Sequence, residues 1–333
     1  MTERDFLSID DLTSVELERL LDRAAALKAD RPGAGAGALA GKTAAMIFEK
    51  PSTRTRISFE VAIAELGGHP LPLSSAELQL GRGETIEDTG RVLSRYVHGV
   101  LVRTFAQERL ERLADAASIP VINALSDLEH PCQALADLLT IREKLGALAG
   151  LKLTYVGDGN NVAHSLLLAG ALAGMHVTIA TPPGYEPIPQ IVKRSTEIAE
   201  TTGGSVTVTT EAPAAVASAD AVYTDVWASM GQEGEAEERR LIFAPYQVNA
   251  VLVARAAERA IVLHCLPAHR GEEITDDVID GPRSVVWDQA ENRLHTQKAL
   301  LERLSAASCS SCAAARCRAR RSSPSCSLAT GSG

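Results

Sequence analysis

Two successive series of short apolar runs, alternating with amphipathic helical segments, constrain the fold of this chain more than any other feature. The expected strands are residues 44–48, 100–103, 121–124, then 151–156, 177–180, 205–210, 221–224, 260–265 and 284–287. Continuous Val, Ile and Leu runs separated by helices are typical of parallel sheets covered on both faces. We therefore expect an α/β chain of two doubly wound parallel-sheet domains, with the active site in the cleft between them.

Composition limits the classes of function. The 333 residues can build two domains, and 45% apolar with 23% charged residues is normal for a soluble protein. The net charge of −9 argues against a nucleic-acid partner, so any anion site must be a local basic pocket. No apolar run reaches the length of a membrane span, and residues 1–5 are too acidic to open a signal peptide. We expect a cytoplasmic protein without a membrane partner.

The run from Phe48 to Glu60 predicts an anion site. It follows an apolar strand, leads into an amphipathic helix, and contains Pro51, then Ser52, Thr53, Arg54, Thr55 and Arg56. A helix N-terminus offers unpaired N–H donors and partial positive charge. Arginine adds a fork that matches phosphate or carboxylate oxygens, and Ser52 is a suitable N-cap. Alone, the run is also compatible with a capped helix and a solvated arginine.

Other candidate side chains follow later strands. Arg103 ends one strand, His130 and Gln133 stand at the start of a long helix, and Asp225 and Cys265 follow two strands of the second series. Because the carboxyl ends of parallel strands share an edge, these groups are expected to face one cleft. Singly, each has an ordinary structural explanation: a solvated arginine, a capping histidine or a small buried thiol.

The segment from Gly157 to Val162 resembles a dinucleotide-binding turn, because it joins a strand to a helix. Val162 replaces the third glycine, and the next strand ends without the acid that would bind a ribose. A dinucleotide-dependent oxidoreductase is therefore a distant alternative. The turn still places Asn161 where its amide can bind a polar substrate.

Together these segments resemble the transcarbamoylase family over roughly residues 6–304. The Phe48–Arg56 run and His130-Pro131-Cys132-Gln133 match its carbamoyl phosphate motifs. His264-Cys265-Leu266-Pro267 resembles the ornithine branch, because a proline replaces the cysteine in the aspartate branch, and Asp225 followed by Ser229-Met230-Gly231 is similar to the ornithine loop. The resemblance implies transfer of the carbamoyl group of carbamoyl phosphate to the δ-amine of L-ornithine, giving citrulline and phosphate in arginine biosynthesis. N-acetylornithine and aspartate are the alternative acceptors.

The resemblance also implies the site residues. Carbamoyl phosphate is expected to contact Ser52, Thr53, Arg54, Thr55, Gln79, Arg103, His130, Gln133, Cys265, Leu266 and Arg293. Ornithine is expected to contact Asn161, Asp225, Ser229 and Met230. The catalytic groups would be Arg54, Arg103, His130, Asp225 and Cys265. Gln79 would reach a neighbouring subunit's site in a homotrimer.

The chemistry fits these residue types. Cationic and hydrogen-bonding groups suit the charge that develops on the carbonyl oxygen and the leaving phosphate. An activated acyl phosphate requires neither a metal nor a cofactor, so we expect none. Asp225 and Cys265 are the pair expected to handle the proton of the amine, and the sequence leaves open which of them does so.

The domain boundaries follow from the two series. Residues 1–145 are expected to bind carbamoyl phosphate, with the final helix 290–304 packing back on them, and residues 146–289 to bind ornithine. Residues 305–333 contain four of the six cysteines, no acid and few large apolar side chains. We expect this tail to be disordered and non-native rather than a zinc site.

Overall fold

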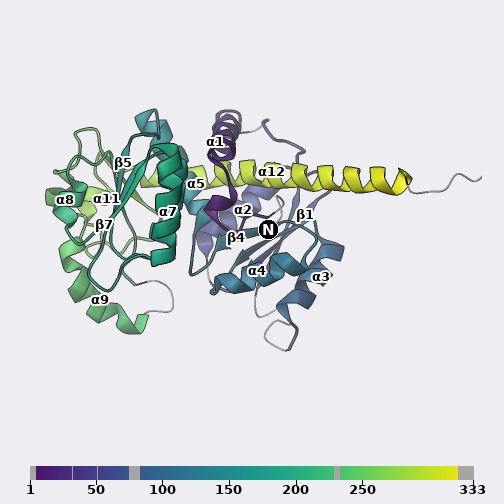
Figure 1. The fold of residues 1–333 in the computed structure, drawn as a ribbon, viewed down its shortest axis with the longest axis horizontal. Coiled ribbons are helices and arrows are strands. Elements are labelled where there is room, and N and C mark those ends of the chain that lie inside the picture. Colours follow the sequence, from purple (N-terminus) through teal and green to yellow (C-terminus); the bar gives the residue numbers. More distant parts are fainter. Residues whose placement is uncertain (1–4, 32, 51, 75–82, 229–232, 322–333) are drawn as a thin grey trace, which may run out of the picture.

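Two parallel sheets form the framework of the chain. The computed structural model describes residues 5–31, 33–50, 52–74, 83–228 and 233–321 (Figure 1). The first sheet has the order β2-β1-β3-β4 and the second the order β7-β6-β5-β8-β9. All strand pairs within these sheets are parallel, which confirms the predicted fold class. The strands are β1 Thr43–Phe48, β2 His69–Ser74, β3 Gly99–Arg103, β4 Val121–Leu125, β5 Lys152–Val156, β6 His176–Ala180, β7 Ser205–Thr209, β8 Ala221–Thr224 and β9 Ile261–His264.

Helices cover both sheets. The helices are α1 Ser14–Ala29, α2 Thr53–Glu65, α3 Ile86–Tyr96, α4 Gln107–Ala116, α5 Pro131–Leu145, α6 Asn161–Leu172, α7 Pro189–Thr202, α8 Ala212–Val216, α9 Ala236–Phe243, α10 Ala250–Val253, α11 Asp276–Ile279 and α12 Val286–Arg321. Helix α1 begins with a capping box, in which Thr13 accepts from the Glu16 N–H and Glu16 bonds back to Thr13. Among the described residues, no helix is both long and apolar enough to span a bilayer.

Two strand predictions differ from the structure. No strand was expected at β2. Its Pro70 and Pro72 are unfavourable inside a sheet, and they are tolerated here because β2 lies at the sheet edge. The strand expected at 284–287 was wrong. There only Ser284 forms an isolated bridge, to Val262, and α12 already begins at Val286.

Helix α12 connects the two halves. It starts beside the second sheet and runs past α5, α2 and α1 of the first half (Figure 1). One hydrophobic cluster is continuous across both halves: it includes Leu101 and Ile122 of the first sheet, Leu153 and Leu263 of the second, and Leu300 of α12. The two sheets therefore share a core instead of being joined only by a linker.

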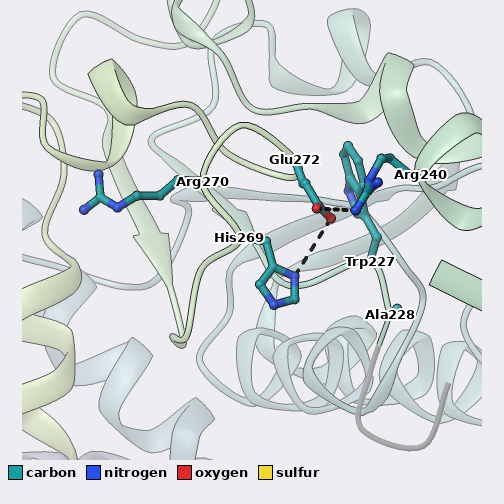
Figure 2. Close-up of a pocket in the computed structure, with 6 residues that line it drawn as sticks. All are labelled: Trp227, Ala228, Arg240, His269, Arg270 and Glu272. Carbon is teal, nitrogen blue, oxygen red and sulfur yellow. Dashed lines mark hydrogen bonds and ion pairs between the residues drawn. The ribbon is translucent and has the colours of Figure 1, made fainter. Parts of the chain in front are cut away.

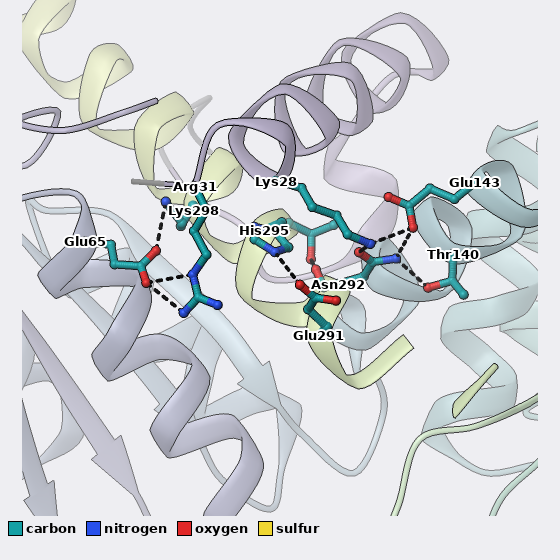
Figure 3. Close-up of polar contacts among 10 residues, drawn as sticks. Lys28, Arg31, Glu65, Thr140, Glu143, Glu291, Asn292, His295 and Lys298 are labelled. Atoms are coloured by element: carbon teal, nitrogen blue, oxygen red, sulfur yellow. Dashed lines mark hydrogen bonds and ion pairs between the residues drawn. The ribbon is translucent and has the colours of Figure 1, made fainter. Parts of the chain in front are cut away.

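Polar contacts let α12 be buried although many of its residues are polar (Figure 3). Lys298 has no exposed surface and its Nζ lies 3.1 Å from Glu65 Oε2 of α2. Asn292 donates to Thr140 Oγ1 at 2.9 Å and to Glu143 Oε2 at 2.8 Å, both on α5. Because buried polar groups are costly unless they are paired, these bonds fix the register of α12 against the first half.

The end of α12 differs from the expected disordered tail. The helix continues to Arg321, and its last turns project beyond the rest of the fold (Figure 1). Alanine and arginine favour helix, and extending an existing helix avoids the cost of nucleation. Residues 322–333 lie outside the described part of the chain.

Candidate active site between the two sheets

A cleft of about 1030 Å³ lies at the carboxyl ends of the strands of both sheets. From the first half it is lined by Lys50, Ser52, Thr53, Arg54, Thr55, Arg103, Phe105, Leu125, Asp127 and His130. From the second half and α12 it is lined by residues that include Asp158, Asn160, Asn161, His164, Tyr185, Ile188, Asp225, Arg239, Cys265, Leu266, Pro267, His269 and Arg293. The position agrees with the rule that ligands bind beyond the carboxyl ends of parallel strands.

The predicted phosphate end is built on the start of α2. Ser52 has extended backbone and stands at the N-cap position, and residues 52–55 line the cleft, so the N-terminal end of α2 borders it. Within the described residues, the Ser52 hydroxyl does not bond to the first turn of α2, which differs from the capping role expected for it. The helix end and the hydroxyl both remain suited to bind an anion.

Three guanidinium groups surround this helix end: Arg54, Arg103 and Arg293 all line the cleft. Burial, followed by the charge of Arg293, lowers the pKa of Arg103 to about 10. Burial and the charge of Arg54 also lower the pKa of Arg293. Both buried guanidinium groups are still charged at neutral pH, so like charges are held close together in a poorly solvated place. An anion would relieve that repulsion.

His130 and Gln133 stand at the start of α5. The His130 N–H donates to Ser165 Oγ at 2.8 Å, and Gln133 Nε2 donates to Asp137 Oδ1 at 2.8 Å. Burial, and then the three arginines, hold the pKa of His130 well below its usual value, so its imidazole is neutral at pH 7. His130 lines the cleft, whereas Gln133 is almost fully buried behind it. Within the described residues, His130 Nδ1 and Gln133 Oε1 have no hydrogen-bond partner.

The acceptor end is built on β8 and β9. Asp225 follows β8 and Cys265 follows β9, and the Cys265 thiol donates to Asp225 Oδ1 at 2.9 Å. Asn160 Nδ2 donates to Asp225 Oδ2 at 3.1 Å. Burial and the neighbouring Asp225 carboxylate raise the pKa of Cys265 well above its ordinary value. The thiol is therefore protonated at neutral pH, with Asp225 as its acceptor.

Asn161, predicted to bind ornithine, lines the cleft but also bonds across it. Its Nδ2 donates to Ser126 O at 2.7 Å. Three further predicted residues, Gln79, Ser229 and Met230, lie outside the described part of the chain.

Sequence reasoning missed several lining residues. Lys50 pairs with Asp127 at 2.6 Å and lies over the Phe105 ring at 4.3 Å. Arg239 pairs with Asp158 at 2.9 Å and lies over the Tyr185 ring at 4.9 Å. Lys50, Phe105, Asp127 and Asp158 each lie two residues after a strand end, which was the available signal. Tyr185 comes from a loop and Arg239 from α9.

The Tyr185 loop approaches the turn after β5 closely. The Gly159 N–H donates to Tyr185 O at 2.9 Å, and a Cβ on Gly159 would lie 2.3 Å from Pro187 N. A glycine is therefore required in this turn for close backbone contact, and not for a pyrophosphate.

A smaller pocket of about 330 Å³ adjoins the acceptor end and shares Ala228 and His269 with the cleft (Figure 2). Arg240 pairs with Glu272 at 2.7 Å. Arg270 points away from these side chains and pairs with Asp276 and Asp280. Because both cations already have carboxylate partners, this pocket is a solvated rim of the cleft.

Comparisons with known proteins agree with this architecture. Residues 4–143 match the family model described as "Aspartate/ornithine carbamoyltransferase, carbamoyl-P binding domain", and residues 149–304 match the corresponding Asp/Orn binding domain. The chain is 62% identical to an ornithine carbamoyltransferase of Parafrankia sp. over 90% of this chain and 96% of that one. An anabolic ornithine carbamoyltransferase of Pyrococcus furiosus is 58% identical over 90% and 95% of the two chains.

Solved structures give the same result. The ornithine carbamoyltransferase structure from P. furiosus superimposes with a TM-score of 0.87 at 57% identity, covering 90% of this chain and 96% of that one. An N-acetyl-L-ornithine transcarbamylase structure reaches a TM-score of 0.82 at 32% identity, covering 90% and 99%. Fold and site define a two-domain α/β protein with a cationic interdomain cleft. The chain belongs to the aspartate/ornithine carbamoyltransferase family.

Proposed function

We propose that this protein is an ornithine carbamoyltransferase, which transfers the carbamoyl group of carbamoyl phosphate to the δ-amine of L-ornithine and releases citrulline and phosphate. The observation that carries the proposal is the pairing of two unlike ends in one cleft. Arg54, Arg103 and Arg293 gather at one end, and the Asp225–Cys265 pair stands at the other. Such a cleft suits an anionic donor and a cationic amino-acid acceptor.

Donor binding would use the start of α2. The N–H groups of its first turn and the three guanidinium groups would hold the phosphate oxygens and stabilise the charge that grows on the leaving group. Neutral His130 would bind the carbamoyl end by hydrogen bonding, with Gln133 close behind it. Much of the rate would come from holding two substrates together away from water.

In this proposal, Asp225 is the group that accepts the proton of the δ-amine. The δ-amine must lose a proton to attack the carbamoyl carbon, and the group that accepts it needs a free lone pair. The Cys265 thiol is protonated and donates to Asp225, so it orients the carboxylate instead of acting as the base.

The decisive assay measures citrulline formed from carbamoyl phosphate, with ornithine, N-acetylornithine and aspartate compared as acceptors. We expect turnover with ornithine to exceed that with the other two by orders of magnitude. N-acetylornithine is included because a relative named for that acceptor shares the fold. Preferred turnover of N-acetylornithine or aspartate would replace the proposed acceptor, and turnover with none of them would refute the activity.

The physiological setting is also part of the proposal. We place the reaction in arginine biosynthesis in the cytoplasm, a direction supported by the anabolic name of the P. furiosus relative.

We also propose a domain division at residues 1–145 and 146–289, and a homotrimer in which Gln79 completes a neighbour's site. Mixing Gln79→Ala chains with Arg54→Ala chains, each expected to be nearly inactive alone, tests the shared site. Mixed trimers should regain activity, and mixtures that stay inactive would refute it.

A further inference from the structure

One face of α6 contacts the loop that carries His130. Helix α6 follows β5 of the second sheet, whereas the loop of residues 126–130 joins β4 to α5 in the first half. Asn161, His164 and Ser165 are spaced i, i+3 and i+4, so they share one face of α6. Each of them bonds to the backbone of this loop.

The three bonds reach alternate residues of the loop. Asn161 Nδ2 donates to Ser126 O at 2.7 Å. The His164 ring Nδ1 lies 2.8 Å from Leu128 O. Ser165 Oγ accepts from the His130 N–H at 2.8 Å. We call this set of three bonds the clasp. It ties the proposed donor side of the cleft to a helix of the acceptor side.

His164 is the centre of the clasp because both of its ring nitrogens are bonded. Nδ1 faces a carbonyl, which can only accept, and Nε2 accepts from the Ile188 N–H at 3.0 Å. This arrangement requires the neutral tautomer with its proton on Nδ1. Burial lowers the pKa of His164, which favours the same neutral form. The ring thus spans from the His130 loop to Ile188 on the opposite wall of the cleft.

The clasp matters because His130 contacts the cleft and is held through its own backbone. Its N–H is bound by Ser165, and Leu128 two residues earlier is bound by His164. A shift of α6 relative to this loop would therefore move the His130 imidazole. A displacement of about 1 Å at a reacting centre is enough to cost a rate on the order of 100-fold.

We propose that His164 is a positioning residue that sets the donor-side His130 loop against the acceptor-side wall through its two ring nitrogens. This inference rests on the proposed function, because it assigns the loop to carbamoyl phosphate and the wall to ornithine. In this proposal, a residue of the second half affects how the first half binds carbamoyl phosphate.

Two substitutions separate the two bonds of the ring. His164→Asn keeps a donor at the position of Nδ1, so the bond to Leu128 O can form while the bond to Ile188 is lost. His164→Gln keeps an acceptor near the position of Nε2, so the bond from the Ile188 N–H can form while the bond to Leu128 O is lost. His176→Asn and His176→Gln are the matched controls, because His176 is a histidine of β6 that bonds Ser205 Oγ at 2.9 Å outside the cleft.

The experiment measures kcat and both KM values in the full chain, with circular dichroism as a check of folding. We expect H164Q to raise the KM for carbamoyl phosphate about tenfold and to lower kcat, as the loss of one buried hydrogen bond predicts. H164N should keep this KM within about twofold of the wild type and raise the KM for ornithine instead. A residue that only stabilised the fold would change both variants alike.

Phosphate binding separates failure of the clasp from failure of the proposed function. Calorimetric titration with inorganic phosphate should give a Kd about tenfold weaker in H164Q than in the wild type, and an unchanged Kd in both His176 variants. Equal KM values and equal phosphate affinity in H164Q, H164N and wild type would overturn the clasp. A wild type that binds phosphate but forms no citrulline would overturn the proposed function, and the phosphate titration would still test the clasp.

Discussion

Arg293 donates a hydrogen bond from Nη2 to Thr55 Oγ1 at 2.6 Å, although 238 positions separate the two residues. The bond brings a guanidinium group of α12 to the start of α2, where Arg54 and Arg103 also line the cleft. The cationic end of the cleft is thus assembled from three distant parts of the chain. Its charge and burial lead to the first two predictions.

Arg54→Ala is expected to lower kcat/KM by about 100- to 1000-fold with little change in Tm, because removing one preorganised charge donor costs about that much. Steady-state citrulline formation and a thermal melt measure the two effects. Arg259→Ala is the control, since Arg259 lies on the surface and pairs with Asp220 at 3.2 Å. Near-normal turnover in Arg54→Ala would refute the phosphate site at α2.

Inorganic phosphate is expected to raise the Tm of the wild-type protein by a few degrees at concentrations well above its Kd. The physical reason is that burial and mutual repulsion destabilise the charges of Arg103 and Arg293, which their lowered pKa values reflect. Differential scanning fluorimetry at matched ionic strength, with chloride as the control salt, measures the shift. An equal shift in wild type and Arg54→Ala would show that phosphate binds elsewhere.

Cys265 is expected to react slowly with iodoacetamide at pH 8. Because burial and Asp225 raise its pKa, the thiolate that reacts is scarce, and the rate should be at least about tenfold below that of the same cysteine in urea. Mass spectrometry of the alkylated peptide follows the reaction. Rapid alkylation in the folded protein would contradict the protonated thiol.

In turnover assays, Cys265→Ser should retain more activity than Cys265→Ala, since a hydroxyl can still donate to Asp225.

Asp137→Asn is expected to change stability in a pH-dependent way. Burial raises the pKa of Asp137 from 3.8 to about 7, so the folded state binds the extra proton between these values, and wild-type stability falls as pH rises from about 4 to 7. The asparagine cannot ionise. The free energy of unfolding of the variant minus that of the wild type should therefore be larger at pH 8 than at pH 5, by a few kcal/mol.

Urea unfolding at the two pH values measures this difference. The amide oxygen of the variant can still accept the hydrogen bonds that Gln133 and Gln289 donate to Asp137 Oδ1 in the wild type. Asp277→Asn is the control, because Asp277 is exposed. A stability difference that is independent of pH would show that Asp137 ionises as an ordinary carboxyl does.

Local pattern predicted much of the framework. Apolar runs located most strands, and the rule for parallel sheets placed Arg103, Asp225 and Cys265 at one cleft, where the structure has them. Pattern failed where a distant neighbour decides the outcome. The prolines of β2 are acceptable because that strand is at an edge, and Val286 begins a helix because α12 packs across both halves.

The clasp could not be predicted either. Asn161 was expected to bind substrate, and its bond to Ser126 O depends on how α6 meets the β4–α5 loop. That arrangement depends on tertiary packing between residues far apart in sequence, which a spacing rule does not capture. The same holds for the Arg293–Thr55 bond, since hydrogen-bond partners on separate elements leave no periodic signal.

The apolar cluster that α12 shares with both sheets makes this molecule a single cooperative unit in unfolding. Leu153 and Leu263 of one sheet belong to the same apolar cluster as Leu101 and Ile122 of the other, with Leu300 of the final helix. Neither half could be expressed alone without exposing part of that cluster to water. Heat should therefore melt both sheets in one transition. A chain truncated before residue 286 should show no cooperative thermal unfolding at all, because neither remaining half folds as an independent domain.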